Sequence, residues 1–193
     1  MIEEITTQIK ESIDTKNKTL DSPIILEMIK SMVEKSIESL NNGGKIIFCG
    51  NGGSFGDAQH LAAEFVSRLR FDRLPLASIA LGTNSSNLSA IGNDYGYEKV
   101  FSRELLSLGK KEDIFIPIST SGNSQNVLEA IKVAKSIGIQ IFGLSGGNGG
   151  KMNDLCDSLI VPSNKTEKIQ EVHIMIGHIF CGLVESFIFK NNK

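Results

Sequence analysis

The 193-residue sequence contains no tryptophan, four prolines, three cysteines and three histidines. The cysteines (Cys49, Cys156 and Cys181) are odd in number and widely spaced, which excludes a disulfide scaffold and a thiolate zinc finger. Lysine and arginine total 20 and the acidic residues total 22, so the formal charge is −2. Because binding to a phosphate backbone requires a basic face, we expect no nucleic-acid partner.

Long hydrophobic runs are also missing from the chain. The acidic N-terminus has no apolar core of a signal peptide, and the longest apolar stretch, 174–184, is too short to cross a bilayer. Hydrophobic residues make up 40% and charged residues 22%, as in ordinary globular proteins. Since reduced cysteines suit the cytosol, we expect a cytoplasmic protein without a membrane partner.

Periodicity predicts one α/β domain over residues 1–193, because no linker or repeat divides the chain. The segment 1–42 predicts two helices: isoleucines recur at helical spacing, and Ser22 precedes a proline as an N-cap would. Five apolar runs without polar alternation predict buried parallel strands, at 45–49, 77–81, 114–118, 140–144 and 158–161. Further helices are expected at 54–70, 98–108, 123–137 and 166–190. This alternation predicts a three-layer α/β/α sandwich, whose ligands bind at the carboxyl ends of the strands.

A glycine-rich loop, Gly50-Asn51-Gly52-Gly53-Ser54, follows the first expected strand. Glycines have no side chain, so a ligand can approach the backbone closely, and the next helix offers free N–H groups to an anion. The dinucleotide fingerprint requires a third glycine at position 55, which is Phe55, so a nicotinamide cofactor is disfavoured. A tight strand-to-helix turn explains the loop equally well.

A hydroxyl-rich loop follows the third strand and provides four side-chain hydroxyls, from Ser119, Thr120, Ser121 and Ser124. A helix cap needs only one such group, so the excess favours anion binding, with the helix N-terminus supplying positive potential. A second glycine cluster, 146–150, fails the P-loop pattern because Met152 stands where Ser or Thr is required. We interpret it as a structural turn before a short helix.

Two histidines, His60 and His178, are candidates for a metal or catalytic site. His60 and Glu64 share one helical face, which suits a metal site or a general base, although an isolated surface pair is the more common explanation. Gln170 and His178 are eight residues apart in an otherwise apolar helix, where a polar group needs a partner. His173 points about 60° aside, and we expect it to be half-buried or on the surface.

The sequence resembles the sugar isomerase (SIS) domain proteins, and specifically the bacterial phosphoheptose isomerases. The segments that carry the resemblance extend from the second helix to the last: 49–54, 57–60 with 63–64, 90–96, 118–124, 149–151 and 169–173 with 177–178. The resemblance implies a flavodoxin-like SIS fold. It also implies conversion of sedoheptulose 7-phosphate to D-glycero-D-manno-heptose 7-phosphate through an enediol, for surface heptose synthesis.

The resemblance further implies roles for individual residues. Glu64 would be the base and His178 the acid at the carbonyl oxygen. Zinc would be bound by His60, Glu64, Gln170 and His178. The phosphate would be held by Ser119, Thr120, Ser121 and Ser124, and the sugar by Asn51, Gly52, Gly53, Ser54, Asn93, Asp94 and Gln170.

The family resemblance also implies a homotetramer with sites at subunit interfaces, and the helices in 1–42 suit such contacts. The sequence argues against two other function classes. A non-catalytic SIS protein that binds a replication initiator would lack the acid at Glu64, which this chain has. A sugar-phosphate sensor usually carries a DNA-binding domain, for which 193 residues leave no room.

Overall fold

The computed structural model describes residues 1–190, which form seven α-helices, two 3-10 helices and one five-stranded sheet. The helices are α1 (Ile2–Leu20), α2 (Pro23–Asn41), α3 (Gly53–Val66), α4 (Ser85–Tyr95), η1 (Tyr97–Lys99), α5 (Val100–Leu108), α6 (Gln125–Ile137), η2 (Gly150–Met152) and α7 (Thr166–Phe189). The strands are β1 (Ile46–Gly50), β2 (Ser78–Ala80), β3 (Ile114–Ile118), β4 (Gln140–Gly146) and β5 (Asp157–Val161). The last three residues of the predicted domain, 191–193, lie outside the described part.

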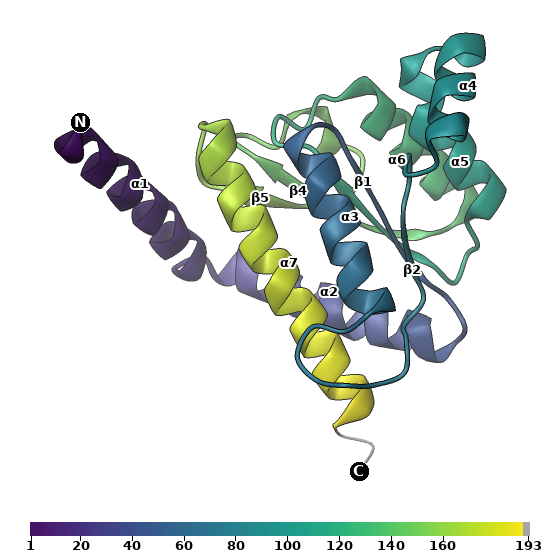
Figure 1. The fold of residues 1–193 in the computed structure, drawn as a ribbon, viewed down its shortest axis with the longest axis horizontal. Helices are drawn as coiled ribbons and strands as arrows, with labels where there is room; N and C mark the ends of the chain where they lie inside the picture. The colour runs from purple at the N-terminus through teal and green to yellow at the C-terminus, as the bar shows by residue number, and fades with distance from the viewer. Residues whose placement is uncertain (191–193) are drawn as a thin grey trace.

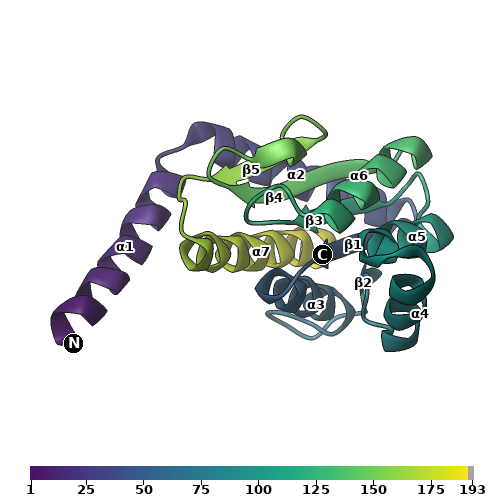
Figure 2. The same ribbon diagram turned by 90° about the horizontal axis from the view of Figure 1, so that it is seen from above.

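The sheet has the order β2-β1-β3-β4-β5, and all its neighbouring strands are parallel. Successive side chains of a strand point to opposite faces, and β1 shows this directly. Ile46 and Phe48 pack with α2, α3 and α7, whereas Ile47 and Cys49 pack with α5 and α6. The helices therefore cover both faces, as Figures 1 and 2 show, and the predicted three-layer sandwich is confirmed.

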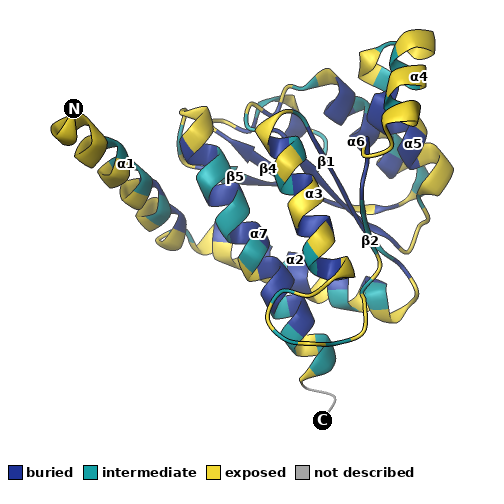
Figure 3. Cartoon of the chain, in the orientation of Figure 1, coloured by how far each residue is buried: buried dark blue, intermediate teal, exposed yellow. Residues whose placement is uncertain are grey.

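The two predicted N-terminal helices are confirmed. α2 begins after Ser22 and buries Ile25, Ile29, Met32 and Val33 against the sheet. α1 extends away from the rest of the molecule, with the N-terminus at its far end (Figure 1). Its isoleucine stripe stays in solvent, since Ile5, Ile9 and Ile13 are 52%, 56% and 53% exposed (Figure 3).

α7 is the longest helix of the described chain and lies beside α2 and α3. It is long and apolar enough to cross a membrane by length and composition alone, but half of its most apolar window is buried within this structure. Val172, Ile176 and Phe180 belong to the hydrophobic core. The helix therefore packs as a core helix of the sandwich.

Two features of the helices differ clearly from the sequence prediction, namely the end of α3 and the presence of α4. α3 ends at Val66 rather than at 70, because Leu69 and Arg70 donate their amide N–H groups to the carboxylate of Glu185. α4 was not predicted, and none of its residues is buried, so the chain carries no apolar periodicity there. Its one local signal is the N-cap Asn84, whose side chain accepts two backbone N–H groups.

Candidate functional site

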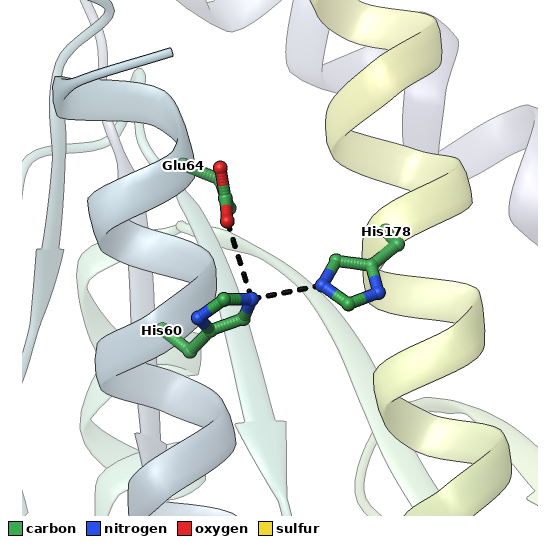
Figure 4. Close-up of side chains that lie close together, drawn as sticks. All are labelled: His60, Glu64 and His178. Atoms are coloured by element: carbon green, nitrogen blue, oxygen red, sulfur yellow. Dashed lines mark hydrogen bonds and ion pairs between the residues drawn. The ribbon is translucent and has the colours of Figure 1, made fainter. Parts of the chain in front are cut away.

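His60, Glu64 and His178 meet between two parallel-running helices. His60 and Glu64 project from α3 and His178 from α7, and the three side chains point toward one another in Figure 4. His60 Nε2 lies 3.2 Å from Glu64 Oε1 and 2.8 Å from His178 Nε2. One ligand atom of each residue lies within 4.8 Å of the others. The predicted i, i+4 pair is therefore joined by a histidine 118 residues away.

A glycine lets the two helices approach at this point. Gly177 precedes His178, and a Cβ on it would meet the side chain of Leu61 at 2.5 Å. Leu61 follows His60 in the chain and is fully buried. The contact between Gly177 and Leu61 thus sets the separation of α3 and α7 at the level of the two histidines.

The cluster has the donors and the access that a metal ion requires. The side chain of His60 is 48% exposed and that of Glu64 is 17% exposed, so the site opens to solvent. Nearby Asp57 has a buried Oδ2 without a hydrogen-bond partner in the described chain, and burial raises its pKa to about 6 although His60 opposes the rise. Two imidazoles and a carboxylate match the three-ligand set of zinc sites that keep one position open.

Gln170 lies further toward the start of both helices. Its amide packs against Gly53, where a Cβ would meet Gln170 Nε2 at 2.6 Å. Two turns of α7, ~12 Å along the axis, separate the backbone of Gln170 from that of His178. Gln170 therefore reaches the beginning of α3, and its predicted roles as fourth metal ligand and as sugar contact stay predictions.

The hydroxyl-rich loop lies at the carboxyl end of β3, as predicted. Ser119 Oγ and Ser124 Oγ are 3.0 Å apart. Ser124 is the N-cap residue of α6, but its side-chain hydroxyl makes no hydrogen bond to the backbone N–H groups of the helix. Thr120 and Ser121 line a pocket of about 480 Å³. The other residues of this pocket come from the glycine cluster and the entry to α7, namely Gly146, Gly147, Asn148, Asn164, Thr166 and Ile169.

The second glycine cluster is a turn followed by the short helix η2, which confirms the structural interpretation. Two of its glycines nevertheless line the pocket beside Thr120 and Ser121. Asn123 joins the two loops, because its side chain donates to Ser121 O and accepts the N–H of Lys151. The cluster therefore forms one wall of the candidate phosphate site.

The first glycine loop is held by a side-chain network that the sequence did not reveal. Asn51 and Asn126 exchange two amide hydrogen bonds of 2.8 and 2.9 Å, and Tyr97 donates a third to Asn51 Oδ1 at 3.1 Å. Asn126 is buried in the first turn of α6. The Asn51 side chain thus joins the glycine loop to the hydroxyl-rich loop, and Gly52, Gly53 and buried Ser54 continue from it into α3.

Asn93 and Asp94 lie on the exposed helix α4, where the Asn93 amide donates to the Asp94 carboxylate at 2.8 Å. Figures 1 and 2 place α4 at the β2 edge of the molecule, apart from α7. Within the described chain, Asp94 does not belong to the His60, Glu64 and His178 group. Their contact with the sugar stays a prediction.

The expected position of His173 is wrong. Its side chain is fully buried on α7, and its Nε2–H donates to the backbone carbonyl of Ser145 at 3.0 Å. Burial lowers its pKa to about 4, so the ring is neutral at pH 7. An isolated histidine at helical spacing carries no signal that separates a core position from a surface one, because its neighbours in space come from β4.

Comparison with known proteins agrees with this geometry. The SIS domain family matches residues 7–146, and the chain belongs to that family. Phosphoheptose isomerase of Aneurinibacillus thermoaerophilus is 53% identical, covering 97% of this chain and 95% of the relative. Phosphoheptose isomerase 2 of Campylobacter jejuni is 52% identical over 93% and 90% of the two chains. Within the SIS proteins, the chain therefore belongs to the phosphoheptose isomerase family.

Solved structures show the same relationship. A phosphoheptose isomerase from Neisseria gonorrhoeae superposes with a TM-score of 0.89 at 40% identity, covering 95% of this chain and 98% of that one. A phosphoheptose isomerase from Francisella tularensis gives 0.90 at 32% identity, covering 95% and 97%. The predicted fold and family are both confirmed.

Proposed function

We propose that this protein is an aldose–ketose isomerase that converts sedoheptulose 7-phosphate to D-glycero-D-manno-heptose 7-phosphate for the synthesis of surface heptose. Membership of the phosphoheptose isomerase family supports this activity. The observation that carries the proposal within the chain is the convergence of Glu64, His60 and His178 in a solvent-accessible group. A non-catalytic SIS protein would have no need for that group.

The reaction moves one proton between adjacent carbons and a second between adjacent oxygens. Glu64 removes the proton from C1 of the ketose while His178 donates a proton to the C2 carbonyl oxygen, which produces the enediol. Glu64 then returns a proton to C2 while the C1 hydroxyl proton returns to His178, which forms the aldehyde. Both residues end in their starting protonation states, as general acid–base catalysis requires.

The phosphate is assigned to the hydroxyl-rich loop. Ser119, Thr120, Ser121 and Ser124 lie at the carboxyl end of β3, directly before α6. Hydroxyl groups and the free N–H groups of a helix N-terminus bind an anion without a lysine or arginine. This arrangement is consistent with the nearly neutral charge of the chain.

We propose zinc as the cofactor, bound by His60, Glu64, His178 and, as fourth ligand, Gln170. When bound, zinc would act as a Lewis acid toward the sugar oxygens. A carboxylate held tightly by zinc would not be free to take a proton, so Glu64 would serve as the base only when it is not bound as a ligand. Elemental analysis of protein purified without a chelator tests the assignment, and a metal-free preparation with full activity would contradict it.

A homotetramer is proposed because two apolar surfaces of the described chain lie in solvent. One is the isoleucine stripe of α1, and the other is a groove of about 500 Å³ between α2 and α7. The groove is lined mainly by Leu26, Ile29, Val33, Ile37, Ile179, Leu183 and Phe187. Contiguous apolar surface of this kind marks protein contacts.

The cytoplasm is the proposed compartment, because the three cysteines are free thiols and reduced cysteines suit the cytosol.

A turnover assay tests the proposed function. Purified protein is incubated with sedoheptulose 7-phosphate and, in parallel, with other ketose phosphates, and aldose formation is followed. We expect turnover of the seven-carbon substrate. Absence of turnover with every ketose phosphate would favour the binding-protein alternative.

A further inference from the structure

Arg73 and Glu185 form a buried ion pair next to the catalytic cluster. Arg73 Nε lies 3.1 Å from Glu185 Oε1, and the two side chains are only 2% and 1% exposed. Arg73 belongs to the irregular segment between α3 and β2, and Glu185 belongs to α7. Burying two charges is costly unless each is fully hydrogen-bonded.

The Nη atoms of Arg73 donate to backbone carbonyls, three of them at the end of α3 and one, that of Leu74, in the segment that follows. Nη2 donates to the carbonyl of Glu64 at 2.8 Å, and Nη1 donates to those of Phe65, Ser67 and Leu74 at 2.6, 3.1 and 3.0 Å. The last carbonyls of a helix have no partner within it, and a cation there is favourable. Arg73 therefore fixes the turn of α3 from which the Glu64 side chain projects.

Glu185 makes the matching connection to α7. Its carboxylate accepts the amide N–H groups of Leu69 and Arg70 at 3.1 and 3.0 Å, in addition to Arg73. It follows His178 by seven residues, two helical turns, and so lies on the same face of α7. The pair thus joins the backbone of Glu64 to the helix that carries His178.

We propose that Arg73 and Glu185 are positioning residues, which hold Glu64 at a fixed distance and orientation from His178 and so maintain the metal affinity and turnover of the site. The inference rests on the proposed function. Neither side chain touches the reacting atoms. The physical reason is that errors of about 1 Å in a catalytic group greatly reduce its rate.

The test separates positioning from stability by a matched control. Arg73→Lys keeps the charge but loses the planar fork that serves several carbonyls at once. Lys45→Met removes another ion pair with a buried carboxylate, Lys45 Nζ with Asp113 Oδ2 at 2.7 Å, in which the Lys45 side chain is 23% exposed. This pair lies just before β1, at the opposite ends of the strands. Thermal unfolding, zinc titration against a competing chelator without substrate, and kcat with KM are measured for both.

We expect Arg73→Lys to lose roughly tenfold or more in zinc affinity, the size of effect seen for supporting groups around metal ligands, and to lose kcat with little change in KM. Lys45→Met should lower the unfolding temperature but leave zinc affinity and kcat unchanged. Wild-type zinc affinity and kcat in folded Arg73→Lys would overturn the proposal. Because zinc is titrated without substrate, a wild-type protein that binds zinc but lacks isomerase activity would contradict the proposed function alone.

Glu185→Gln provides the second variant if Arg73→Lys does not fold. The amide keeps the volume and one acceptor but removes the charge opposite Arg73. The same losses of zinc affinity and kcat are expected. If neither variant folds, the pair serves stability and the positioning role is wrong.

Discussion

At the scale of single residues, the site combines groups that the sequence could and could not reveal. The spacing of His60 and Glu64 predicts a shared helical face. Their contact with His178, 118 residues from His60, follows from the packing of two helices and was available only through the family resemblance. Arg73 and Glu185 were missed, because nothing local distinguishes a buried ion pair from the many charges that face solvent.

Glu64→Gln should abolish isomerisation while leaving the fold intact. The amide has nearly the same volume but cannot take a proton, and loss of a general base costs on the order of 10²–10⁴ in rate. Turnover and circular dichroism are compared with those of Glu112→Gln, an exposed glutamate that precedes β3. Undiminished turnover in Glu64→Gln would remove it from the base role.

His173 should make the protein less stable as the pH falls. Its folded pKa of about 4 lies below the usual 6.5 because of burial, so the unfolded chain takes up a proton first. The stabilisation is complete above pH 6.5 and decreases as the pH falls toward 4, by roughly 3 kcal/mol at most. Urea unfolding between pH 7.5 and 4.5 should show a smaller decrease for His173→Gln. Equal slopes would contradict this assignment.

At the scale of elements, the close approach of α3 and α7 is what creates the site. Most helices and every strand of the described chain were predictable, because the helices carry apolar residues at helical spacing and the strands are short, largely apolar runs. α4 was not predictable, since it buries no residue. The separation of two helices depends on residues far apart in the sequence, such as Gly177 and Leu61.

Gly177→Ala should weaken metal binding by forcing α3 and α7 apart. The added methyl would meet Leu61 at 2.5 Å and push His178 away from His60. Gly56→Ala in α3 is the matched control, because its Cβ would meet nothing within 4 Å. Zinc titration should show a loss of affinity only for Gly177→Ala, and equal affinities in the two variants would show that the contact does not set the site.

Asn126→Ala should raise KM for the sugar phosphate more than it lowers kcat. The change removes both hydrogen bonds to Asn51 and so loosens the glycine loop relative to the hydroxyl-rich loop. Zinc affinity should not change, because the His60, Glu64 and His178 group lies on other helices. Steady-state kinetics beside a zinc titration check both statements, and an unchanged KM would contradict the linking role.

At the scale of the whole molecule, the sandwich could be predicted from the alternation of strands and helices, whereas the exposed apolar groove could not. Phe187 is 51% exposed and Ile179 is 39% exposed, although both lie on an apolar helix that the sequence presents as core throughout. Periodicity identifies an apolar face but not whether the same chain or another copy covers it. The proposed tetramer provides that cover.

Phe187→Glu should break the proposed tetramer into smaller species. A carboxylate in the groove between α2 and α7 would lose its hydration in the assembly, which costs free energy. Among the residues that line the groove, Lys30 is the one cation that could offset this cost. Light scattering coupled to size exclusion measures the mass, and Glu34→Gln serves as a control at the rim. A tetramer that persists in Phe187→Glu would place the interface elsewhere.

The central claim is proton transfer by Glu64 between adjacent carbons of a sugar phosphate. It is tested most directly by incubating the protein with sedoheptulose 7-phosphate in D₂O and analysing the product by NMR. We expect the wild-type protein to form the aldose with deuterium at C2, and Glu64→Gln to form none. Absence of aldose with the wild-type protein, or equal aldose formation by Glu64→Gln, would contradict the account.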